Sequence, residues 1–146
     1  MSWIELESST YQHHVIHHVL GATVLGWVVI GDALHVLLDI GLLWTIYVNG
    51  EMSLMAQAVA IQDLVSDETS EIQQLTSDAQ LLISEGREAA GLARFTPAPV
   101  ECAIISVDVF ASGSLRKIVV AGETADLTIE TSMDRSHFAI DHTSHP

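Results

Sequence analysis

Four histidines near the start of the chain have the residue type and the spacing of metal ligands. In the sequence HHVIHH, four residues separate His13 from His17 and His14 from His18. Residues four apart lie on one face of an α-helix, and imidazole binds zinc, copper and haem iron. These four histidines are the candidate ligands for a metal or a haem. No HExxH or CxxC motif accompanies them, so another chain would have to complete a closed site; an interfacial histidine cluster without metal is the alternative.

A second polar group lies within the apolar sequence that follows. Asp32, His35 and Asp39 are three and four residues apart, so on a helix their side chains would be neighbours. In a continuous helix, positions eighteen residues apart share one azimuth, which places His14 and His17 on the same stripe. Two functions compete for this stripe: polar contacts with a partner helix, or a path for protons or ions.

The sequence contains no motif that predicts an enzyme. GxSxG, the phosphate-binding loop and the glycine pattern of dinucleotide sites are all absent. Cys102 is the only cysteine, and its β-branched surroundings predict a small buried residue rather than a nucleophile. We therefore predict no catalytic residues and no required cofactor.

The element that would carry both polar groups is the apolar segment 15–48. It contains no lysine, arginine, glutamate or proline, and about 20 apolar residues suffice to cross a bilayer as a helix. The sequence predicts one long transmembrane helix, preceded by an acidic tail over residues 1–14. No basic residue flanks the segment, and the absence of basic residues from the N-terminal side predicts a cytoplasmic or interior C-terminal part. The alternative is a soluble oligomer with this segment buried in its core.

Two further regions follow the Asn49-Gly50 turn signal. Residues 51–95 carry an apolar heptad seam, which predicts a helical stalk, as a coiled coil or an antiparallel hairpin. Residues 99–140 are rich in β-branched residues separated by turns, which predicts a small antiparallel β meander. Residues 141–146 are expected to be a flexible tail. The predicted fold class is therefore α+β.

Composition limits the partners. Nineteen acidic residues against five basic ones give a net charge of -14, which excludes binding to nucleic acid phosphates. This composition is also typical of halophilic proteins, whose self-repulsion is screened in concentrated salt.

Together these features predict a membrane-anchored structural or assembly protein of a halophilic archaeon or of a membrane-containing haloarchaeal virus. Its expected location is a cell or virion membrane, and its expected partners are the bilayer and either further copies or a larger assembly. The rival hypothesis is a redox or proton-transport subunit that uses HHVIHH and the Asp32/His35/Asp39 group.

Overall fold

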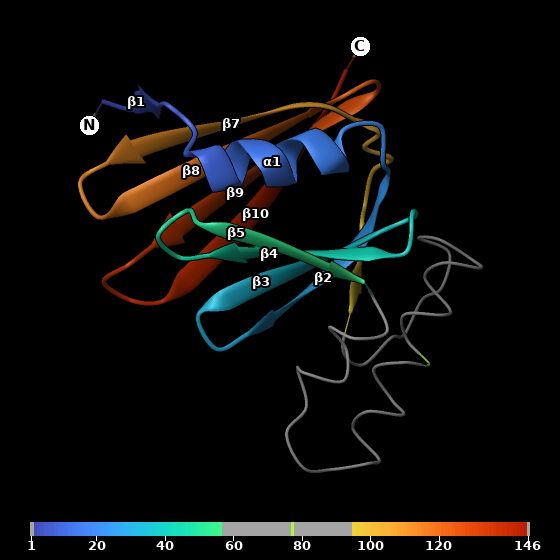
Figure 1. Ribbon diagram of the computed structural model, residues 1–146, viewed down its shortest axis with the longest axis horizontal. Coiled ribbons are helices and arrows are strands. Elements are labelled where there is room, and N and C mark those ends of the chain that lie inside the picture. Colours follow the sequence, from blue (N-terminus) through green and yellow to red (C-terminus); the bar gives the residue numbers. More distant parts are fainter. Residues whose placement is uncertain (1, 57–76, 78–94, 146) are drawn as a thin grey trace.

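The computed structural model describes residues 2–56, 77 and 95–145, and these residues form a predominantly β structure (Figure 1). One sheet has the strand order β1-β7-β8-β9-β10 and the other β5-β4-β3-β2-β6. All neighbouring strands within each sheet are antiparallel. The elements are β1 (Ile4–Leu6), α1 (Thr10–Val19), β2 (Val24–Ile30), β3 (Ala33–Leu38), β4 (Leu42–Tyr47), β5 (Met52–Ala56), β6 (Thr96–Pro97), β7 (Ile104–Ser112), β8 (Leu115–Gly122), β9 (Ala125–Ser132) and β10 (His137–Ser144).

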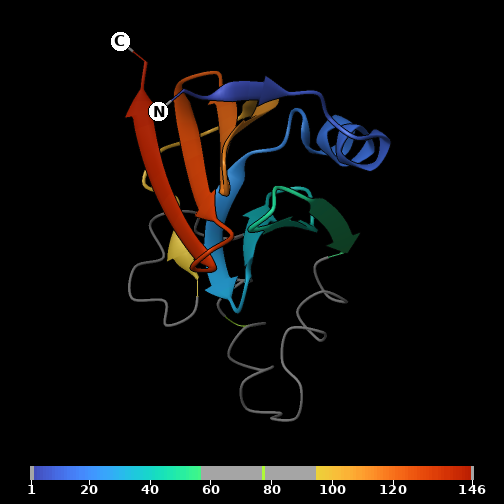
Figure 2. The ribbon, with the colours of Figure 1, turned by 90° about the vertical axis from the view of Figure 1, so that its left-hand side faces the viewer.

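The two sheets share one hydrophobic core. Leu34, Val36 and Trp44 from the β2–β5 sheet belong to the same buried cluster as Ile118 and Leu127 from the other sheet. Helix α1 contacts β5 and β7, and so closes one side of this core (Figure 2). Burial of apolar side chains between the layers is the main source of stability for a fold of this kind.

One backbone connection joins the two sheets directly. Residues 21–27 run antiparallel to residues 96–104, through the β2–β6 pairing and an isolated bridge between Thr23 and Ala103. Gly21 N–H donates to Ile104 O at 2.8 Å, and Ile104 N–H donates to Ala22 O at 2.9 Å. Residues 96–104, which lead from β6 in one sheet to β7 in the other, are therefore hydrogen-bonded to residues 21–27.

The predicted transmembrane helix over residues 15–48 is wrong. That segment holds the second half of α1 and then the strands β2, β3 and β4. Among the elements that the structure describes in full, α1 is the one helix, and no helix of the described residues is long and apolar enough to cross a membrane. The predicted membrane anchor and membrane location are therefore wrong, and the prediction of a bilayer partner loses its basis. The predicted α+β fold class is also wrong, because the described residues form two antiparallel sheets with one short helix.

Glycines explain why the segment folds as strands. Gly31, Gly41 and Gly50 have φ values of +62°, +77° and +90° and lie in the turns after β2, β3 and β4. This left-handed conformation is open to glycine but strained for other residues. The strand β3 is buried at all six positions, so it lacks the alternation of apolar and polar residues that marks a half-exposed strand.

The C-terminal region contains the expected antiparallel meander, as the consecutive strands β7, β8, β9 and β10. Strand β10 continues to Ser144, so residues 141–144 are strand and not the predicted tail. Most of the predicted stalk, residues 57–76 and 78–94, lies outside the described residues. Its first residues, Met52–Ala56, form β5, and no coiled coil occurs in the part that is described.

Candidate metal site on helix α1

The candidate histidines lie on a helix that is fixed at its start. Ser9 is its N-cap: the Ser9 hydroxyl accepts from Gln12 N–H at 3.1 Å, and Ser9 N–H donates to Gln12 Oε1 at 2.9 Å. This reciprocal pair satisfies donors that a helix leaves free in its first turn. The predicted N-terminal tail therefore contains the strand β1 and the beginning of α1.

The same helix is also fixed along one face. Val15, Ile16 and Val19 are buried in the core. The amide of Gln12 is buried as well, and its Nε2 donates to Gly50 O at 2.7 Å in the β4–β5 turn. The opposite face is exposed and carries all four histidines of the HHVIHH sequence.

The rings of two of these histidines are close enough to bind one metal ion together. The ring centroids of His14 and His18 are 4.7 Å apart, with an interplanar angle of 76°. A metal bound at about 2.0–2.1 Å from each nitrogen would lie about 3.2 Å from each centroid. With a ligand–metal–ligand angle of about 90–110°, the two centroids would then be about 4.5–5.2 Å apart. The observed separation falls within that range.

The remaining histidines do not complete the coordination sphere. The ring centroids of His17 and His18 are 6.1 Å apart, which is farther than the separation of about 4.5–5.2 Å expected for two ligands at an angle of about 90–110° on one ion. No group of three or more His, Cys, Asp or Glu side chains in the described ranges is arranged to hold a metal. The helix therefore offers two neighbouring ligands, which suit a mononuclear ion and not the two opposite axial positions of a haem.

The predicted stripe of Asp32, His35 and Asp39 does not exist. Asp32 and Asp39 are exposed in the turns on either side of β3, whereas His35 lies within that strand and is buried. Asp39 Oδ1 accepts from Thr23 N–H at 2.9 Å, so this carboxylate joins the residue after β3 to the residue before β2. Because the three side chains are separated, they cannot form a proton path.

His35 forms a buried pair with a residue of the neighbouring strand. Its Nδ1 is 2.9 Å from Thr45 Oγ1, and both side chains are only 7% exposed. Burial lowers the pKa of His35 to about 4, because desolvation disfavours the charged imidazolium. His35 is therefore neutral near pH 7 and has a structural role.

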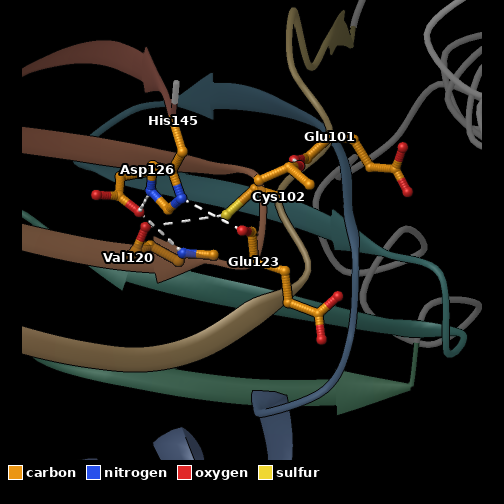
Figure 3. Close-up of polar contacts among 8 residues, drawn as sticks. Glu101, Cys102, Val120, Glu123, Asp126 and His145 are labelled. Atoms are coloured by element: carbon orange, nitrogen blue, oxygen red, sulfur yellow. Dashed lines mark hydrogen bonds and ion pairs between the residues drawn. The ribbon is translucent and has the colours of Figure 1, made fainter.

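A polar cluster that the sequence did not predict joins the end of β10 to the β8–β9 turn (Figure 3). His145 Nε2 is 2.8 Å from Asp126 Oδ1, and His145 Nδ1 is 3.2 Å from Glu123 O. The same Asp126 oxygen accepts from Gly122 N–H at 3.0 Å. His145 is 19 residues from Asp126 and 22 from Glu123 in sequence, and the pairing of β9 with β10 brings it to them.

Cys102 lies beside this cluster but is not a nucleophile. Its thiol is fully buried and points to Val120 O at 3.9 Å. Burial, and to a smaller extent the charge of Asp126, raises the pKa of the Cys102 thiol to about 11. Nucleophilic attack requires the thiolate, so this residue has the buried structural role that the sequence predicted.

The comparisons with known proteins add no further constraint. No protein-family model matches this chain, and no curated protein or solved structure is significantly similar to it. The functional argument therefore rests on the geometry of the residues described above.

Proposed function

We propose that this protein binds a divalent transition-metal ion through His14 and His18, and that its role is binding rather than catalysis. The observation that carries the proposal is the 4.7 Å separation of the two imidazole rings, which matches two ligands of one ion. Imidazole nitrogens favour Cu²⁺, Ni²⁺ and Zn²⁺ over Mg²⁺ and Ca²⁺.

The electrostatic surroundings favour a cation at this position. His17 and His18 lie in the last turn of α1, where the partial negative charge of the helix terminus stabilises positive charge. The net charge of -14 further raises the local concentration of cations around the protein. Both effects act on any divalent ion, so the selection among metals comes from the imidazoles.

A second copy of the chain is the proposed source of the missing ligands. Two histidines leave about half of a tetrahedral coordination sphere open. If two α1 helices meet around a two-fold axis, each contributes the same pair and the ion gains four imidazole ligands. The ion would also offset part of the repulsion between two acidic chains. In this proposal the chain forms a dimer only when the metal ion is bound.

The test is titration of the full chain with ZnCl₂. Calorimetry measures the affinity and stoichiometry of binding, and light scattering measures the molar mass with and without the metal. We expect binding at one ion per two chains together with a shift from monomer to dimer. His14→Ala and His18→Ala should each weaken binding at least tenfold, or about 1.4 kcal/mol. The matched control is His137→Ala with His142→Ala, which removes two exposed histidines of β10 and should change neither result.

Each alternative result has a distinct meaning. Binding at one ion per chain without dimerisation would retain the metal site and reject the second copy. Equal affinity of the control and the two α1 variants would reject the site itself. At a free Zn²⁺ concentration 100 times the dissociation constant, binding should also stabilise the native chain by about 2.7 kcal/mol, and this gain should vanish in the α1 variants.

A further inference from the structure

The three basic residues in the described part of this acidic protein lie at one end of the sheet that contains β8. The chain has five lysines and arginines, and the described ones are Arg116, Lys117 and Arg135. Arg116 and Lys117 lie near the start of β8, and Arg135 lies in the β9–β10 turn. Figure 1 shows the β7–β8 hairpin and the β9–β10 turn at the same end of the sheet. In a chain of net charge -14, this local concentration of cations requires an explanation.

A cavity lies at this end of the sheet, and Arg135 is the one of these three cations that lines it. Its volume is about 210 Å³, and its lining includes Trp3, Leu115, Glu130, Arg135, His137 and Ala139. Leu115, Trp3 and Ala139 supply apolar surface, whereas the other three side chains supply one carboxylate, one guanidinium and one imidazole. Pockets for drug-sized ligands have volumes of about 300–1,000 Å³, so this cavity fits a smaller molecule.

The aromatic wall of the cavity is held in place. Lys117 Nζ lies 4.7 Å from the centroid of the Trp3 ring and 5.4 Å from that of Phe110. A cation at this distance from an aromatic face is attracted to the ring. Trp3 directly precedes β1, which pairs with β7 from Ile4↔Ala111 onward. The indole is thus fixed both by the backbone and by a cation–π contact.

The two opposite charges that line the cavity, Glu130 and Arg135, are not paired with each other. Within the described residues, the structure shows no ion pair between Glu130 and Arg135, although both line the same cavity. A ligand that carries both charges could satisfy both side chains through charge-assisted hydrogen bonds.

We infer that this cavity binds a free α-amino acid with an apolar side chain. The ligand carboxylate would pair with Arg135 and His137, its ammonium with Glu130, and its side chain would contact Trp3 and Leu115. A zwitterion has no net charge, so the field of the protein does not repel it, as it would repel a simple anion. A simple cation would instead meet the unfavourable charge of Arg135. This inference is independent of the metal site on α1.

The experiment uses calorimetry on the full chain with L-leucine and two analogues that each lack one charge. We expect L-leucine to bind, and N-acetyl-L-leucine and L-leucinamide to bind at least tenfold more weakly. Glucose tests the alternative that the indole and the polar groups recognise a sugar. No binding of L-leucine at millimolar concentration, or tighter binding of glucose than of L-leucine, would overturn the inference.

Two variants assign the charges to their partners. Glu130→Gln should weaken L-leucine binding at least tenfold and abolish the difference between L-leucine and N-acetyl-L-leucine. Arg135→Gln should abolish the difference between L-leucine and L-leucinamide. Asp108→Asn is the matched control, because Asp108 is an exposed carboxylate on β7 that does not line the cavity. If the control loses as much affinity as Glu130→Gln, the proposed contact is refuted.

Discussion

The buried pair of His35 and Thr45 predicts that acid destabilises this protein through one residue. His35 is neutral in the folded chain because burial lowers its pKa from 6.5 to about 4. The unfolded chain binds a proton at His35 as the pH falls below about 6.5, whereas the folded chain does so only near pH 4. Stability from this residue is therefore complete above pH 6.5 and is lost progressively down to about pH 4.

The size of the effect follows from the two pKa values. Between pH 7 and pH 5, the unfolded state gains about 0.7 of a proton at His35, whereas the folded state gains only about 0.1. Integration of this difference gives a loss of about 2 kcal/mol in the free energy of unfolding. The double variant His35→Val with Thr45→Val replaces the pair by β-branched residues that suit a buried strand position and do not titrate.

The assay is urea unfolding of both proteins at pH 7 and pH 5, in about 1 M salt, where the Debye length is only about 3 Å and repulsion between surface charges is screened. The wild type should lose about 2 kcal/mol more between the two pH values than the double variant. His142→Ala removes an exposed histidine of β10 and should behave as the wild type. Equal losses in the wild type and the double variant would refute the reasoning.

Two further substitutions test the packing around the strands and the helix. Gly122→Ala would place a Cβ 2.3 Å from Ala125 O and 2.8 Å from Cys102 Sγ, so we expect a loss of about 1–3 kcal/mol; an unchanged thermal midpoint would contradict this packing. Gln12→Ala removes the hydrogen bond to Gly50 O and half of the capping box, and should cost about 1–3 kcal/mol in urea unfolding. His13→Ala, on the exposed face of the same helix, should change stability by less than about 0.5 kcal/mol.

Local sequence signals predicted the strands of the second half well. The segments that contain β7, β8 and β9 combine β-branched residues with turns of glycine and small polar residues, and each strand lies where this pattern occurs. In β9, Leu127 and Ile129 are buried and Thr128 and Glu130 are not. That alternation identifies a strand with one face in the core.

Residues 15–48 lack this alternation, because β3 is buried on both faces. Leu34 and Val36 face the shared core, and His35 and Leu37 on the other face are also buried. Such a strand has the same hydropathy as part of a transmembrane helix. The spacing of Gly21, Gly31 and Gly41 indicates turns within this segment. The hydropathy of the segment indicates a membrane helix instead, and the predicted membrane function rested on that hydropathy.

The candidate sites show the same division between local and distant contacts. The pairing of His14 with His18 depends only on helical spacing, and the structure places their rings side by side. The stripe through Asp32 and Asp39 depended on a continuous helix and is absent. The cavity beside Trp3 brings together residues 3, 115, 130 and 135, whose proximity depends on strand order, which no local pattern encodes.

The shared core has a consequence for synthesis of the chain on the ribosome. Strands β2 to β5 emerge before β7. Their inward-facing side chains, among them Val36, Trp44 and Ile46, belong to one buried cluster with side chains of β7, β8 and β9. Those partners do not exist until residues 104–132 have been translated. Until then the nascent strands β2 to β5 expose an apolar face that nothing from β7 to β9 covers, and this exposure makes the nascent chain prone to aggregation. We therefore expect nascent chains that end before β7 to depend on chaperones, and completed chains to be released from them.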